Sequence, residues 1–399
     1  MQIRWISVLQ RKLRSAKECK RTLESFGQGK EIQRRLRAPS PSGKRLLVIR
    51  LDDIGDYLLF RNQLGMYKTS PHWKNHSITL LGNASWKDIF TTCDRETVDD
   101  TIWINKSAYL TSTAYQLEIW ERLRARGFET VIAPSRTRPL MLDDLCMLAA
   151  APAHNIGCVN TYVHPEWNQV SDVLYQKLFR PSDTAIHEFH FNAEFAAAMC
   201  GVRYEGRRPK IDVRLPSPHA APYIICFVGA NTRSKRWPIK RWVEFIKLYV
   251  KELPGSVILA GGNAREVAMA AAIHEHTGAR SIAGKVSLPE LLAWVEGSRA
   301  VITNDTMAAH LGASYDRPTV IVANGVNYQR FTEYAAAGIE RVTTLYPDVF
   351  SRKRKRVAGL SYNYVDAISS DMASIRAATV VQALREVLGV SPAPGHHPS

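Results

Sequence analysis

Apolar runs and amphipathic stretches alternate along the first half of the chain. Residues 46–49 form a short apolar run typical of a strand covered on both faces, and similar runs predict strands at 77–81, 100–104 and 130–134. Stretches with helical periodicity lie between them, for example at 114–126. Strands that alternate with helices predict a parallel sheet with helices on both of its faces.

The same alternation starts again after a segment rich in proline, residues 209–222. A second buried-strand pattern, 223–229, follows it directly and ends in glycine. The elements expected after it are strands at 256–260, 300–303 and 319–322 and helices at 241–253, 264–277, 287–297 and 371–388, the last of which closes the fold. Because proline-rich stretches commonly separate domains, we predict two α/β domains, residues 44–215 and 216–390, with a ligand site between their strand ends.

Length and composition agree with two globular domains. A chain of 399 residues with 45% hydrophobic content can form two cores, since single domains stop growing near about 250 residues. No run approaches the roughly 18 to 20 uncharged apolar residues of a membrane-spanning helix. The six cysteines show no CxxC pair, which predicts reduced thiols in a cytoplasmic protein and neither a disulfide framework nor a zinc site. The N-terminus lacks the pattern of a secretory signal.

Positive charge is concentrated at the N-terminus. The net charge is +16, and residues 1–45 carry 13 Lys or Arg against 3 Asp or Glu. The leader, residues 1–43, is therefore either a basic helix on an anionic membrane surface, at the inner face of the cytoplasmic membrane, or a solvated segment. A second basic cluster lies at 352–356, and the tail at 391–399 is expected to be disordered. No nucleic-acid motif accompanies the charge, so we expect no nucleic-acid partner.

The first candidate site lies where the first predicted strand turns into a helix. Asp56 in this turn can either cap the helix or, at the ligand edge of a parallel sheet, take the proton of an attacking hydroxyl. On the residues alone, both roles stay open. Gly55 can let a ligand approach the backbone, and Arg50 and Asp53 belong to the same turn.

A basic loop follows the second apolar run. Lys235 precedes a helix whose N-terminus favours a phosphate or diphosphate group, and its ammonium group could add a positive charge there. Thr232 and Ser234 can add hydroxyl donors. On the residues alone, an ordinary solvated basic loop is the favoured interpretation.

A third candidate segment joins the strand expected at 300–303 to the next helix. The backbone amides of Thr306, Met307 and Ala308 at that helix N-terminus can bind donor phosphates. Asp305 is expected in the site but can also cap the helix. His310, one turn on, is expected to support the site.

Two weaker candidates complete the set. Glu290, on the helix expected at 287–297, can accept a hydrogen bond from a ribose or a base, or it is a surface carboxylate. Arg330 lies in the loop after the last predicted strand, and we expect this loop to face the ligand site.

Four segments in this order resemble glycosyltransferase family 9, the heptosyltransferase family. They are LVIRLDDIGD (47–56), SKRWP (234–238), AGKVSL (283–288) and NDT with AHL (304–306 and 309–311). The resemblance implies a GT-B fold, in which two Rossmann-like, doubly wound domains face a central cleft. It also implies inversion at the anomeric carbon without a metal or cofactor, with Asp56 as catalytic base, Lys235 beside the leaving nucleoside diphosphate, and Asp305 at the donor sugar's hydroxyls. It further implies an acceptor held by the N-terminal domain, where we expect Gly55, Arg50 and Asp53 to contact it.

The resemblance also implies a substrate class. ADP-heptose is the family's default donor, and the acceptor is a saccharide or lipid-linked molecule in cell-envelope polysaccharide synthesis. This chain departs from the family pattern at Phe227-Val228-Gly229, where a His-Pro-Gly triplet is usual, at Met307, where glycine is usual, and in the loop 324–331. These departures leave the donor sugar open. They also favour a second hypothesis, a non-catalytic nucleotide-sugar-binding or scaffold protein of the same fold.

Overall fold

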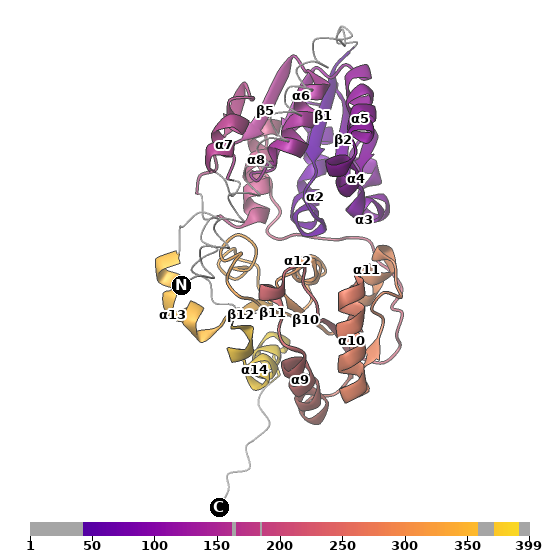
Figure 1. Ribbon diagram of the computed structural model, residues 1–399, viewed down its shortest axis with the longest axis vertical. Coiled ribbons are helices and arrows are strands. Elements are labelled where there is room, and N and C mark those ends of the chain that lie inside the picture. Colours follow the sequence, from indigo (N-terminus) through magenta and orange to yellow (C-terminus); the bar gives the residue numbers. More distant parts are fainter. Residues whose placement is uncertain (1–42, 162–164, 184–185, 358–370, 391–399) are drawn as a thin grey trace, which may run out of the picture.

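The computed structural model describes residues 43–161, 165–183, 186–357 and 371–390. The predictions for the basic leader and for the tail at 391–399 therefore lie outside the described residues, as do most side chains of the basic cluster at 352–356. The described chain forms two parallel six-stranded sheets, one in each half of the molecule (Figure 1). The predicted α/β architecture is confirmed.

The N-terminal sheet has the strand order β3-β2-β1-β4-β5-β6. Every residue of the central strand β1 after Arg45 is buried, which explains its apolar run. The strand order reverses between β1 and β4, so the loops after these two strands diverge and leave space at the sheet edge. The strands are β1 (Arg45–Arg50), β2 (Ser77–Asn83), β3 (Asp100–Ile104), β4 (Thr130–Ala133), β5 (His154–Cys158) and β6 (Lys177–Phe179).

Helices cover both faces of this sheet. Leu46 and Val48 pack in one apolar cluster with residues of α2 and α8, whereas Leu47 and Ile49 pack in another with residues of α5 and α6. The alternation follows from the two-residue period of a strand. The helices are α2 (Ile54–Thr69), α3 (Lys87–Cys93), α4 (Lys106–Thr111), α5 (Thr113–Ala125), α6 (Leu145–Ala150), α7 (Pro165–Asp172) and α8 (Glu188–Cys200), with 3-10 turns at Ala84–Trp86 and Arg95–Thr97 and a π-helical turn at Leu140–Asp144.

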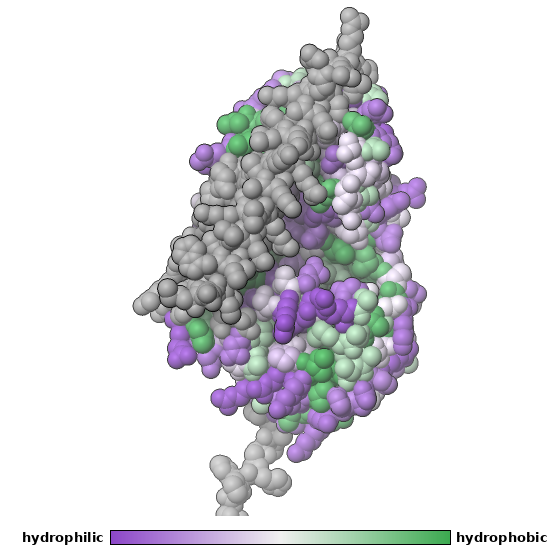
Figure 2. Space-filling model, viewed as in Figure 1, coloured by the Kyte–Doolittle hydropathy of each residue, from purple (hydrophilic) through white to green (hydrophobic). Residues whose placement is uncertain are grey.

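The C-terminal sheet repeats this order as β12-β11-β10-β7-β8-β9, and its order reverses between β7 and β10. Its strands are β7 (Tyr223–Phe227), β8 (Ser256–Ala260), β9 (Arg280–Ser281), β10 (Ala300–Asn304), β11 (Thr319–Val322) and β12 (Val342–Leu345). Its helices are α9 (Ile239–Glu252), α10 (Ala264–Thr277), α11 (Leu288–Glu296), α12 (Met307–Ser314), α13 (Asp348–Val357) and α14 (Ala377–Leu388). Polar and apolar residues are interspersed over the face of this domain seen in Figure 2.

The two domains share an apolar core. Helix α12 packs against α2, and α11 packs against α3. One cluster of buried residues accordingly joins Leu64 and Tyr67 of the N-terminal domain with Leu292 and Leu311 of the C-terminal domain. The loops that follow the central strands of both sheets are thereby held next to this junction.

The closing helix begins later than expected. We predicted a helix from 371, but the structure has a 3-10 turn at Met372–Ser374 and α14 starts only at Ala377. The indole nitrogen of Trp237 donates to the carbonyl oxygen of Ile375 at 3.0 Å, and Arg376 at the N-cap is extended. The expected helix start was therefore wrong because Ile375 is anchored to another part of the domain.

Two further expectations concern the whole chain. Over the residues that the structure describes, no helix is long and apolar enough to cross a bilayer. Five of the six cysteines lie in the described part, and all five are free thiols, as predicted.

Candidate active site

The three strongest candidate residues come from the points where the strand order of each sheet reverses. Asp56 lies in the first turn of α2, directly after β1. Lys235 ends the 3-10 turn Arg233–Lys235 after β7, and Asp305 follows β10. The carboxyl ends of strands at such reversal points are the usual ligand sites of parallel sheets. The interdomain junction brings the two sets of loops together.

Asp56 does not cap its helix. The N-cap of α2 is Asp53, and Asp56 occupies the third helical position. Its Oδ1 atom lies 3.6 Å from Nη2 of Arg330, and a fifth of its side chain is exposed. Burial raises the pKa of Asp56 above its ordinary value, and Arg330 partly offsets that rise. A carboxylate with a raised pKa that is still partly exposed suits a general base.

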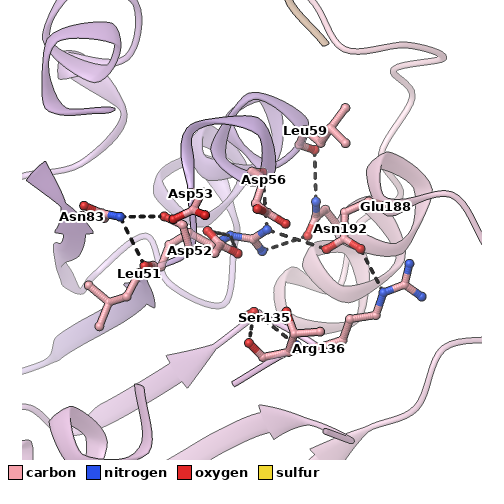
Figure 3. A network of polar contacts seen from close by, with 12 residues as sticks. Leu51, Asp52, Asp53, Asp56, Leu59, Asn83, Ser135, Arg136, Glu188 and Asn192 are labelled. Atoms are coloured by element: carbon pink, nitrogen blue, oxygen red, sulfur yellow. Dashed lines mark hydrogen bonds and ion pairs between the residues drawn. The ribbon is translucent and has the colours of Figure 1, made fainter. Parts of the chain in front are cut away.

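A buried carboxylate, Glu188, lies beside Asp56 (Figure 3). Its Oε2 accepts from Nε of Arg136 at 2.9 Å and from Nε of Arg330 at 2.8 Å, and its Oε1 lies 3.7 Å from Nη2 of Arg50. Burial opposes ionisation, but the three guanidinium groups outweigh it and hold the pKa of Glu188 well below its usual range. Glu188 is therefore a fixed negative charge.

Arg50 fixes the turn before α2. This residue is completely buried; its Nε donates to Asp52 at 2.9 Å and its Nη1 donates to Asn192 at 3.0 Å. The contact of Arg50 with an acceptor stays a prediction. Asp53 is exposed and pairs with Lys106 at 3.0 Å, and its contact with an acceptor stays a prediction.

Lys235 and Asp305 form an ion pair. Nζ of Lys235 lies 2.9 Å from Oδ2 of Asp305, and Nδ2 of Asn327 donates to the same oxygen at 2.8 Å. The preceding residue, Asn304, fixes the pair because its side-chain amide donates to the carbonyl oxygen of Gly229 at 2.8 Å. Lys235 is thus a partnered lysine and not part of a freely solvated loop.

Two other donor-side candidates lie at the same turn. Thr232 and Ser234 are exposed and stand next to Lys235, as a donor-binding role would require. A hollow of about 870 Å³ reaches the same turn from the start of α9 but includes neither Asp56 nor Asp305. Donor contacts for Thr232 and Ser234 stay predictions.

The N-terminus of α12 is capped by Thr306 and not by Asp305. The Thr306 hydroxyl accepts from the backbone N–H of Ala308, which occupies one of the amides expected to bind phosphate. Met307, the residue between them, is half-buried and packs against the shared core. The cap leaves the side chain of Asp305 for Lys235 and for a ligand.

His310 on α12 closes the space beside Gly55. A Cβ atom on Gly55 would lie 3.0 Å from Cδ2 of His310 and 3.6 Å from Cα of Met307. Helix α12 therefore packs closely against Gly55, and a contact of Gly55 with an acceptor stays a prediction. Burial lowers the pKa of His310 to about 4, and its Nδ1 hydrogen-bonds the hydroxyl of Tyr334, so the imidazole is neutral near pH 7.

Glu290 completes a helix cap. Its Oε2 accepts from the backbone N–H of Ser287 at 2.7 Å and from the Ser287 hydroxyl at 2.8 Å, and these bonds lower the pKa of Glu290. The Ser287 side chain in turn accepts from the Glu290 backbone, which makes a capping box. The side chain is exposed, so a ribose contact stays a prediction.

Sequence reasoning missed the residues that link the candidates. Glu188 and Asn327 have no motif of their own, and Arg136 lies in the loop after β4. Arg136 reaches Glu188 beside Asp56 because β4 is the neighbour of β1 at the reversal point, and this strand order was not part of the sequence prediction.

Comparisons with known proteins agree with the expected family. A model described as Glycosyltransferase family 9 (heptosyltransferase) matches residues 180–338. Lipopolysaccharide heptosyltransferase 2 of Salmonella typhimurium is 28% identical over 93 residues, which are 22% of this chain and 26% of that protein. The matched stretch thus spans about a quarter of that relative's length.

Solved structures extend the likeness to both domains. A glycosyl transferase family 9 structure from Veillonella parvula has a TM-score of 0.66 at 17% identity and covers 88% of this chain and 99% of its own. The E. coli heptosyltransferase WaaC with ADP has a TM-score of 0.63 at 17% identity and covers 86% and 99%. These matches confirm the GT-B fold, and together with the family model they confirm the resemblance to this family of enzymes.

Proposed function

We propose that this relative of glycosyltransferase family 9 is an inverting, metal-independent glycosyltransferase with a nucleoside diphosphate sugar as donor. One observation carries the proposal: a partly buried carboxylate from one domain, Asp56, and a lysine–aspartate pair from the other, Lys235 and Asp305, occupy the reversal points of two facing sheets. The family match over the C-terminal half supports the same function.

On the acceptor side, Asp56 acts as the base. The acceptor oxygen forms a bond to the anomeric carbon of the donor, and its proton passes to the Asp56 carboxylate as that bond forms. The raised pKa of Asp56 strengthens it as a base, and Arg330 opposes part of that rise. An acceptor hydroxyl must lie within hydrogen-bond reach of this carboxylate.

On the donor side, the bond between the anomeric carbon and the diphosphate oxygen breaks, and its electron pair leaves with the nucleoside diphosphate. The ammonium group of Lys235 and the backbone amides at the start of α12 stabilise the charge that the leaving group gains. Asp305 accepts hydrogen bonds from donor sugar hydroxyls. The acceptor oxygen attacks the anomeric carbon on the face opposite the departing diphosphate, and this in-line displacement inverts the carbon.

ADP-heptose is the donor we propose first, with a saccharide or lipid-linked acceptor in lipopolysaccharide synthesis. Structural relatives named as heptosyltransferases were solved with ADP and with ADP-2-deoxy-2-fluoro heptose, which supports an adenine nucleotide. The substitutions Phe227 and Met307 lie on the donor side, so another sugar is the main alternative. We propose that the protein works at the inner face of the cytoplasmic membrane, where the basic leader would contact anionic lipid.

The test measures nucleoside diphosphate release from a panel of donors with lipopolysaccharide-type acceptors. Asp56→Asn should lower kcat by roughly 100- to 10,000-fold, because proton transfer by a positioned base contributes about that much. Asp316→Asn is the matched control: Asp316 is exposed and its φ of 56° is a conformation that Asn adopts readily. Calorimetric binding of the nucleotide with no turnover on any acceptor would favour the non-catalytic alternative, and full activity of Asp56→Asn would remove the proposed base.

A further inference from the structure

Residues 324–331, which we name the bridging loop, connect the two halves of the candidate site. The loop follows β11 in the C-terminal domain and makes contacts with both groups of charged residues. Its Asn327 donates to Asp305, and its Arg330 reaches Asp56 and Glu188 of the N-terminal domain. The base and the donor-side aspartate are thus each held by a side chain of the same short loop.

Glu188 fixes Arg330 at two points. The backbone N–H of Glu188 donates to the carbonyl oxygen of Arg330 at 2.9 Å, and Nε of Arg330 donates to Oε2 of Glu188 at 2.8 Å. The guanidinium group also stacks on the ring of Phe331 at 4.5 Å and donates to the Thr137 hydroxyl at 3.4 Å. Because contacts hold the Arg330 backbone, its Nε atom and the face of its guanidinium group, this group has one orientation.

That orientation directs Nη2 of Arg330 at Asp56. Solvent screens this ion pair only weakly, since only a tenth of the Arg330 side chain and a fifth of the Asp56 side chain are exposed. Attraction between opposite charges is stronger in such surroundings than in water. The charged groups around Asp56 are Arg330 from the bridging loop, Glu188 from α8, Arg50 from β1, and Asp52 and Asp53 from the turn before α2.

We propose that Arg330 is a positioning residue that holds the Asp56 carboxylate in place and ionised for proton transfer, and that Glu188 in turn holds Arg330. This inference rests on the proposed function. It assigns the bridging loop of the donor domain a task in the chemistry of the acceptor domain. The base is then complete only when the two domains are in contact.

The direction in which the pKa of Asp56 changes without Arg330 follows from the charged groups that remain around it. Burial and the negative charge of Glu188 both raise the pKa of Asp56, whereas Arg330 lowers it. Without Arg330, a larger fraction of Asp56 is protonated at any given pH, and a protonated carboxyl group cannot accept the acceptor's proton. Activity should then require a higher pH.

The experiment follows the Asp56 carboxyl carbon by ¹³C NMR in the full chain, labelled in its aspartate side chains, without substrate. Asp56→Asn removes and thereby assigns the signal. In Arg330→Gln the titration midpoint should rise by about 1 unit or more, the usual size of one arginine's effect on a neighbouring aspartate. Arg330→Lys should recover more than half of that shift, and the control Arg341→Gln, an exposed arginine of the same domain, should leave the midpoint unchanged.

An unchanged midpoint in Arg330→Gln would overturn the inference. Once an active donor is known, the acid limb of the pH profile of kcat/KM must also move to higher pH in Arg330→Gln. An acid limb that stays in place would overturn the inference as well. The proposed transferase function and the proposed role of Arg330 can be told apart. A shifted midpoint in a protein that turns over no donor would support the Arg330–Asp56 pair and contradict the transferase function. Glu188→Gln is less suitable as the main test, because it leaves buried arginines unpaired and threatens the fold.

Discussion

The two halves of the candidate site hold their charges in different ways. In the N-terminal half, Glu188 is completely buried between Arg50, Arg136 and Arg330, and most of these side chains have little or no contact with solvent. In the C-terminal half, one ion pair joins Lys235 to Asp305, and Lys235 belongs to a turn whose neighbouring residues are exposed.

This difference indicates different tasks. Buried charges keep the partners they have, because separating them in a water-poor environment is costly. The arginine cluster is therefore suited to presenting Asp56 in one fixed state. Lys235, in contrast, is partly exposed, and in the proposed mechanism it turns from Asp305 toward an incoming diphosphate. We expect substitutions around Glu188 to act mainly on folding and substitutions on the donor side to act mainly on the reaction.

The largest effect is expected for Glu188→Gln. Removing the one negative charge shared by three arginines should lower the free energy of unfolding by about 3 to 5 kcal/mol, as for other buried ion pairs with one partner deleted. Urea unfolding of the full chain measures it. Glu121→Gln, on the exposed side of α5, is the matched control and should stay near wild type. If both variants lose the same stability, the proposed contrast between the two halves does not hold.

The next effect is expected for Lys235→Met, and it should appear in the rate. Loss of the ammonium group should lower kcat by about 100- to 1,000-fold, the usual cost of deleting one group that stabilises charge in the transition state. The unfolding free energy should change much less than in Glu188→Gln, because Lys235 is partly exposed and Asp305 keeps its bond to Asn327. Lys251→Met, an exposed lysine in the last turn of α9, controls for loss of surface charge. A Lys235→Met enzyme with normal kcat would contradict the donor-side assignment.

The same contrast explains what could be predicted from the sequence. Asp56, Lys235 and Asp305 each follow an apolar run that forms a central strand, so pattern and family motif indicated all three. Arg50 belongs to the same motif, yet the motif does not indicate its hydrogen bond to Asn192, which is distant in sequence.

The partners of Glu188 show why the rest could not be predicted. Arg136, Glu188 and Arg330 come from a loop, a helix start and a second domain, and no local pattern connects them. Their pairing depends on how the two sheets face each other. The short strands β6 and β9 were missed for a related reason, since runs of two or three residues are fixed by neighbouring strands and not by their own periodicity.

The smallest expected effect tests whether the two halves meet in solution as the structure has them. Gly55 and Gly65 lie on the same helix, α2, and alanine normally stabilises a helix by up to about 1 kcal/mol relative to glycine. At Gly65 an added Cβ would meet only Cγ2 of Thr97 at an ordinary 3.8 Å, so Gly65→Ala should raise the unfolding free energy by about 0.5 to 1 kcal/mol.

At Gly55 the same Cβ would lie 3.0 Å from His310 of the other domain, and crowding a packed interface typically costs about 1 to 3 kcal/mol. The gain in helix propensity and the cost of crowding oppose each other. We expect Gly55→Ala to lower the unfolding free energy by roughly 1 kcal/mol, opposite in sign to Gly65→Ala. Thermal and urea unfolding of the two variants measure the difference directly. If both alanines stabilise the protein equally, α12 does not press on α2 in solution, and the Arg330–Asp56 contact across the same junction loses its structural basis.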